Sequence, residues 1–144
     1  VRDAAWLNWR YVDTPSRRAE CYALRSPDGR RTDGWAVFEF QDGHGYLVDL
    51  LARDDATRRR LVQAFTVLGH ARGMQEATVL VCDHDPLVDP LRELGWAPAA
   101  GDLAFRDTFP FIVRACRDDA SSDDLALPRW WLADGDRDAE HMSP

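Results

Sequence analysis

The stretch GYLVDLLARDDATRRRLVQAF, residues 45–65, joins a strand pattern to a helix pattern and decides the class of the fold. Its first part, residues 46–52, is apolar apart from Asp49, which is typical of a strand inside a sheet. Its second part brings charged residues first and then apolar residues at helical spacing. The stretch therefore predicts a strand that runs directly into a helix, with a carboxylate near the end of the strand.

The predicted helix has recognisable start and stop signals. Asp55 or Thr57 can cap its first turn, because both side chains carry an oxygen that accepts a backbone N–H. Gly73 is a suitable C-terminal stop, so we expect the helix to end near Arg72. Its buried stripe is expected to consist of Leu61, Val62, Phe65 and Leu68.

Asp-Gly pairs separate the strand patterns in the first part of the chain. Asp28-Gly29 and Asp42-Gly43 each lie between two apolar or alternating runs, which is a strong signal for a β-hairpin. The three runs should therefore pair as an antiparallel meander. We expect its strands at residues 20–25, 34–40 and 46–52.

Further helix and strand patterns flank this meander. A helix is expected over residues 3–12, where Asp3 can cap the first turn. Residues 77–82 form a continuous apolar run, as in a strand that is covered on both faces. After this run we expect a short helix with Leu87, Leu91 and Leu94, a stop at Gly95, and strands at 104–106 and 109–115.

The composition limits the fold and the partners. With 144 residues the chain has the length of one domain, and the element order predicts a single α+β domain over residues 1–144. The net charge of −7 argues against nucleic-acid binding, which needs a basic face. No apolar run has the length of a membrane span. Three well-separated cysteines favour a reduced, cytoplasmic setting.

Two segments resemble the GNAT superfamily of acyl-CoA-dependent N-acetyltransferases. Residues 91–96, LRELGW, are similar to the Y-E-K-L-G-F ending of the family's fourth helix. Residues 45–52 resemble the family's central strand, which leads into the cofactor helix. The resemblance implies a mixed, mostly antiparallel sheet with flanking helices. The family's first strand and helix have no counterpart before Trp6, which predicts a truncated view or the C-terminal half of a tandem or longer GNAT protein.

The resemblance also implies an activity and a cofactor. A GNAT enzyme moves the acetyl group of acetyl-CoA to an amine of a small molecule, a sugar or a peptide. The pantetheine of acetyl-CoA lies along the central strand, and the start of the following helix faces the phosphates. The implied cofactor-binding residues in this chain are Leu50, Leu51, Ala52, Arg58 and Arg59.

Two carboxylates are candidates for the catalytic base that takes a proton from the attacking amine. Asp49 occupies the place on the central strand where the family often has a carboxylate. By strand alternation Asp49 should share a face with Leu47 and Leu51, whose apolar side chains would raise its pKa. Glu39 is the second candidate and should share a face with Val37 on the preceding strand.

The alternative is a non-catalytic GNAT-like module that binds a substrate or a partner, with a small-ligand sensor as a third interpretation. The glycine-rich turn of the family is absent, and Leu91 stands where the family commonly has a tyrosine that protonates the leaving thiolate. The expected protein partner is a second copy of the chain or an upstream GNAT domain. No metal site is expected, because the contiguous residues 82–85, CDHD, cannot all face one ion.

Overall fold

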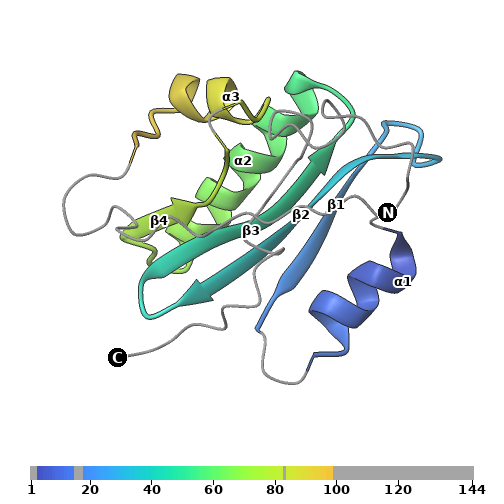
Figure 1. Cartoon of the computed structure of the whole chain (residues 1–144), viewed down its shortest axis with the longest axis horizontal. Helices are drawn as coiled ribbons and strands as arrows, with labels where there is room; N and C mark the ends of the chain where they lie inside the picture. The colour runs from blue at the N-terminus through green and yellow to red at the C-terminus, as the bar shows by residue number, and fades with distance from the viewer. Residues whose placement is uncertain (1–2, 15–17, 83, 99–144) are drawn as a thin grey trace, which may run out of the picture.

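One sheet organises the part of the chain that the structure describes (Figure 1). The computed structural model describes residues 3–14, 18–82 and 84–98, and the strands expected at 104–106 and 109–115 lie outside these ranges. The spatial order of the four described strands follows the chain. These strands are β1 (Glu20–Arg25), β2 (Thr32–Gln41), β3 (His44–Ala52) and β4 (Glu76–Val79).

The first three strands form the predicted antiparallel meander. β1 pairs with β2, and β2 pairs with β3, both in antiparallel orientation. The β2–β3 hairpin turns through Asp42 and Gly43, whose φ angles are 51° and 81°. A tight hairpin turn requires positive φ at both central residues, and an Asp-Gly pair adopts this conformation readily. The meander prediction is therefore confirmed.

β4 joins the sheet in parallel, beside β3. The two strands are connected by α2 (Asp55–Ala71), because parallel neighbours need a long crossover. The result is a mixed sheet in an α+β arrangement, which confirms the predicted fold class at that level. The regular part of β4 is shorter than the expected run 77–82, and its residues are exposed or partly buried rather than covered on both faces.

Helices lie on both sides of the sheet. α2 and α3 (Val88–Glu93) lie on one side, while α1 (Ala4–Leu7) and the π-helix η1 (Asn8–Val12) that continues it lie on the other (Figure 1). The helix expected over residues 3–12 is confirmed, although its second half is wound more widely than an α-helix. Among the described residues, no helix combines the length and apolar character needed to cross a membrane.

The larger core lies between the sheet and α2. Phe65 of α2 is at its centre, with ring centroids 5.0 Å from Phe38 and 5.4 Å from Phe40. Leu61 and Val62, from the predicted stripe, are buried beside it. The same core includes Leu68, which is partly buried, and Leu87 and Leu91 at α3.

α2 starts from a different cap than expected. Its N-cap is Asp54, whose carboxylate accepts the backbone N–H of Thr57 at 2.8 Å. Asp54 has an extended backbone, with φ −154° and ψ 171°, which is the conformation of an N-cap. The prediction that Asp55 or Thr57 is the N-cap was wrong. Adjacent aspartates such as Asp54 and Asp55 cap equally well, and the point at which β3 ends determines which of them is the N-cap. Gly73, with φ 78°, follows the helix as predicted.

A β-bulge in β3 corrects the predicted orientation of Asp49. Val37 of β2 pairs with Asp49, but the next residue of β2 pairs with Leu47, so Val48 is an extra residue in β3. Leu47 belongs to the core under α2, whereas Val48 packs with Tyr11 on the opposite face. Asp49 also bonds to Tyr11, so it lies on the face opposite Leu47. The prediction from alternation, that Asp49 and Leu47 share a face, was wrong.

We expect Phe65→Ala to lower the free energy of unfolding by about 3–5 kcal/mol, because it empties the centre of the larger core. Phe65 is fully buried, whereas Val67, two residues along α2, is 67% exposed. Val67→Ala is therefore the matched control and should change stability by less than about 0.5 kcal/mol. Urea unfolding followed by circular dichroism measures both variants. Equal losses would contradict the packing of α2 on the sheet.

Candidate functional site

Asp49 is the most buried carboxylate among the described residues, with 1% of its surface exposed. The bulge at Val48 turns it toward the face of the sheet that η1 covers. A buried carboxylate needs hydrogen-bond donors, since an isolated charge in the interior is costly. The predicted catalytic base thus lies in the interior, at an irregular point of β3.

Tyr11 of η1 supplies a donor to this carboxylate. Its phenolic O–H donates to Oδ2 of Asp49 at 2.9 Å, and Tyr11 itself is 2% exposed. The two residues are 38 positions apart, so local sequence patterns could not reveal the contact. A buried tyrosine hydroxyl generally has a partner, but only the fold identifies which group it is.

Cys21 of β1 completes a row of residues across the sheet. It pairs with Val37 of β2, which in turn pairs with Asp49. Partial burial raises the pKa of the Cys21 thiol, and the negative charge of Asp49 raises it further. A thiol with a raised pKa is less ionised at neutral pH and is a weaker nucleophile than an ordinary cysteine. Of the residues in this row, Asp49 rather than Cys21 is therefore the candidate for a reactive group.

Glu39, the second candidate base, lies on the same face of the sheet. It is 8% exposed, and Val37, two positions before it, belongs to the core on that face. The prediction that Glu39 and Val37 share a face is confirmed. Glu39 pairs with Tyr46, and the bulge lies between this pair and the Val37–Asp49 pair. The sheet thus brings both candidate carboxylates to the face that η1 covers.

β3 and β4 are paired along only part of β3. The parallel pairs run from His44–Glu76 to Leu47–Val79, and β3 then continues to Ala52. Asp49 lies two residues beyond the last pair. A strand that continues past the end of its neighbour leaves backbone N–H and C=O groups along that edge. Within the described ranges, this segment of β3 is the strand edge next to Asp49 at which a ligand can take strand-like hydrogen bonds.

The three predicted strand contacts to the cofactor lie along this segment. Leu50 is buried in the core under α2, Leu51 is 47% exposed, and Ala52 is partly buried. All three pair with β2 on the other edge of β3. Their side chains point to different faces, so a ligand at the open edge would meet their backbone rather than their side chains.

Both predicted phosphate contacts at the start of α2 are in ion pairs. Arg58 pairs with Asp55 in the same turn. Nε of Arg59 lies 2.6 Å from Oε2 of Glu93 at α3. Their hydrogen bond raises the pKa of Arg59 and lowers the pKa of Glu93. Each pair uses one guanidinium nitrogen, so a phosphate that binds either arginine has to share it with a carboxylate.

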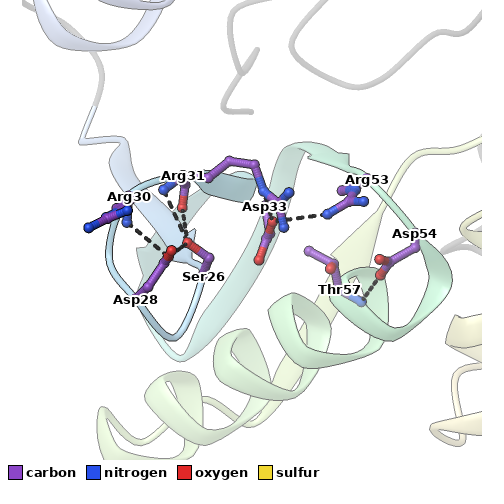
Figure 2. A network of polar contacts seen from close by, with 8 residues as sticks. All are labelled: Ser26, Asp28, Arg30, Arg31, Asp33, Arg53, Asp54 and Thr57. Atoms are coloured by element: carbon purple, nitrogen blue, oxygen red, sulfur yellow. Dashed lines mark hydrogen bonds and ion pairs between the residues drawn. The ribbon is translucent and has the colours of Figure 1, made fainter.

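A polar network surrounds the same end of the sheet (Figure 2). Asp33 lies between two arginines: its Oδ1 is 2.7 Å from Nε of Arg31 and 3.7 Å from the guanidinium of Arg53. Ser26 and Asp28 order the β1–β2 turn before them, where the backbone N–H of Arg31 donates to Ser26 Oγ. The sequence-based interpretation missed this cluster because it depends on how β2 pairs with β3.

The described residues fit one part of acyl-CoA better than another. The open edge of β3 beyond Leu47 offers backbone groups that match the amides of pantetheine. At the start of α2, however, Asp54 occupies the Thr57 N–H, a donor of the kind that binds phosphate at a helix start. Arg31 and Arg53 share the single carboxylate of Asp33 and are both 57% exposed, so they are further cations for a phosphate at this end.

A hollow of about 230 Å³ lies at the β2–β3 hairpin, lined by residues 40–44 with Arg72 and Met74. None of the predicted site residues lines it. Among the described residues, no group of three or more His, Cys, Asp or Glu side chains is arranged to hold a metal ion.

Comparison with known proteins assigns no family to the chain. No protein-family model, no curated protein and no solved structure matches it. The function therefore has to be inferred from the side chains and the strand geometry.

Asp54→Ala should destabilise the protein at neutral pH but not in acid. Hydrogen bonds from Thr57, the side chain first and then the backbone N–H, hold the pKa of Asp54 below its ordinary value. A lowered folded-state pKa stabilises the folded protein above the unfolded-state pKa, and this stabilisation is lost as the pH falls through the folded-state value. The difference from the wild type should therefore shrink as the pH falls through the lowered folded-state pKa of Asp54.

Urea unfolding at a series of pH values measures this difference. Asp54→Ser is the matched control, because serine keeps an oxygen acceptor for the Thr57 N–H but does not titrate in this range. At pH 7 its stability should lie between those of the alanine variant and the wild type. A loss in Asp54→Ala that does not change with pH would show that the carboxylate charge does not stabilise α2.

Proposed function

We propose that the chain is an acyl-CoA-dependent N-acetyltransferase domain that acts on an amine of a small molecule, a sugar or a peptide. The position of Asp49 carries this proposal: a buried carboxylate lies two residues beyond the point where β3 loses its β4 partner. A thioester held along the freed edge would present its carbonyl carbon next to a base. The order of the strands and helices supports the same function.

The reaction needs one proton transfer and one exchange of bonds. The nitrogen of the amine attacks the carbonyl carbon of the thioester, the C–N bond forms, and the C–S bond breaks to release the CoA thiolate. Asp49 takes the proton from the attacking nitrogen, and the thiolate takes one from water. The base has to be ionised before the attack. The hydrogen bond from Tyr11 favours the ionised form.

Direct transfer to the amine is favoured over an acyl-cysteine route. Cys21 lies in the same row as Asp49, but burial and the charge of Asp49 both raise its pKa. A catalytic cysteine normally has a lowered pKa and a cationic neighbour. Cys21 has the opposite environment, so we assign it no role in the transfer.

The acceptor amine is expected to approach from the η1 face of the sheet. Asp49 and Glu39 both lie on this face, on neighbouring strands. Two carboxylates in a sparsely hydrated region attract a cationic group and favour an acceptor that carries more than one amine. The substrate class that fits this face is therefore a basic small molecule or a peptide with a lysine side chain.

A non-catalytic GNAT-like module is the second candidate function. The start of α2 favours it, since Arg58 and Arg59 are held by carboxylates and Asp54 takes the Thr57 N–H. Leu91 also favours it, because a buried leucine stands where GNAT enzymes commonly have a tyrosine that protonates the thiolate. Such a module would bind a substrate, a second copy of the chain or an upstream GNAT domain without transferring an acetyl group.

Asp49→Asn should lower kcat by about 10²–10⁴-fold and leave the affinity for acetyl-CoA nearly unchanged. Asparagine keeps the shape of the side chain and can still accept the Tyr11 hydrogen bond, but it cannot take a proton. Isothermal calorimetry with acetyl-CoA measures the affinity, and thiol release in the presence of primary amines measures turnover. The absence of heat at millimolar acetyl-CoA with the wild type would favour the non-catalytic module.

Glu39→Gln is the matched control, because it removes the other buried carboxylate on the same face. It should keep kcat within about threefold of the wild type if Asp49 is the base. The reverse result would assign the base to Glu39. Thermal melting of both variants separates a loss of chemistry from a loss of folding.

A further inference from the structure

The turn that carries Tyr11 is unusual. η1 is a π-helix of five residues, Asn8–Val12, closed by the N–H of Asp13, which donates to the carbonyl of Asn8 at 2.8 Å. π-helical turns are rare and occur frequently at functional sites. They replace the tighter hydrogen bonds of an α-helix, so they persist where the surrounding contacts favour them.

η1 buries its polar aromatic residue and exposes its apolar ones. Tyr11 is 2% exposed, whereas Trp9 and Val12 are 62% and 63% exposed. Apolar burial alone would favour the opposite choice, because removing tryptophan or valine from water is favourable and burying a hydroxyl is not. What distinguishes Tyr11 is its hydroxyl, which reaches Oδ2 of Asp49. The orientation of η1 is thus explained by the polar contact.

We propose that Tyr11 is the positioning residue of Asp49 in acetyl transfer, an inference that rests on the proposed function. The phenol holds the carboxylate in one orientation on the η1 face, where the amine arrives. Trp6 packs edge-on against the Tyr11 ring, with centroids 5.7 Å apart, and so holds the phenol in place. Tyr11 acts through Asp49 and does not contact the reacting atoms.

Several other groups surround this contact. α1, Ala4–Leu7, carries no charged side chain. On β1, the Cys21 thiol has a raised pKa and therefore adds no charge near neutral pH. A donor to the ionised carboxylate lowers its pKa, and Tyr11 is such a donor. Among the described residues, the titratable or charged side chains on this face include Tyr11 and Arg10 on η1, Cys21 on β1, Glu39 on β2, and Tyr46 with His44 packed against it on β3.

Tyr11→Phe tests the proposal, because it keeps the ring and removes the donor. The acidic limb of the pH profile of kcat/KM should move to higher pH by about one unit, since the Asp49 carboxylate loses a hydrogen bond that favours its ionised form. On the plateau, kcat should fall about tenfold with little change in KM for acetyl-CoA. A residue that only supported the fold would lower stability without moving the limb.

Tyr22→Phe is the matched control. It also removes a phenol, but the Tyr22 hydroxyl bonds to Glu20 and its ring packs on the core under α2. Its pH limb and its kcat should equal those of the wild type. Turnover is measured as thiol release from acetyl-CoA, with benzylamine, spermidine and a lysine peptide as acceptor probes. A ¹³C NMR titration of the Asp49 carboxyl, assigned with Asp49→Asn, follows the same pKa without turnover.

Each outcome has a distinct meaning. A raised limb and a raised carboxyl pKa in Tyr11→Phe, with a lower kcat, support the positioning role. Wild-type turnover together with an unshifted limb and an unshifted titration in Tyr11→Phe would overturn the positioning role and leave the proposed function intact. No turnover by the wild type with any of the three acceptors would overturn the proposed function and the positioning role with it.

Discussion

A single extra residue in β3 determines which chemistry this sheet can carry. Without the bulge at Val48, regular alternation along β3 would place Asp49 on the face of Leu47, in the aromatic core under α2. A charge there would lie among apolar rings, at a cost of several kcal/mol. The bulge places it instead against Tyr11. Bulges also bend and twist a strand, and the β3–β4 pairing ends at Leu47, immediately before the extra residue. One irregularity therefore accounts for both the buried carboxylate and the open strand edge.

The two faces of the sheet have different roles. The face under α2 buries a cluster of aromatic and aliphatic side chains around Phe65, and apolar burial of this kind stabilises the fold. The face under η1 has a smaller apolar cluster, of Tyr11, Val37 and Val48, and carries the buried carboxylates of Asp49 and Glu39. Burying carboxylates costs free energy, which the larger core can offset. The apolar core under α2 can thus offset the free-energy cost of burying carboxylates on the face under η1.

What could be predicted from the sequence was the part that local chemistry decides. The Asp-Gly turn at Asp42 requires positive φ whatever surrounds it, and the helix pattern after it depends only on spacing. The bulge could not be predicted, because register is a property of two strands together. The Tyr11–Asp49 contact joins residues 38 positions apart, so it also depends on the fold. The sequence therefore identified Asp49 as the candidate base from its residue type and its position on the strand. It did not predict the face on which Asp49 lies or its hydrogen bond with Tyr11.

The ion pairs of the arginines at the start of α2 are weak evidence against phosphate binding, and so against an enzyme. Arg59 and Glu93 are a partly exposed pair, and such pairs contribute little to stability. Arg59 contacts Glu93 through Nε alone, so its other N–H groups can bind phosphate through charge-assisted hydrogen bonds. The Thr57 N–H is different, because Asp54 caps the helix through it. A ligand that displaced Asp54 would remove a contact that stabilises α2. A phosphate at this end is therefore better held by arginine side chains than by the helix backbone, which places the main recognition of an acyl donor on β3.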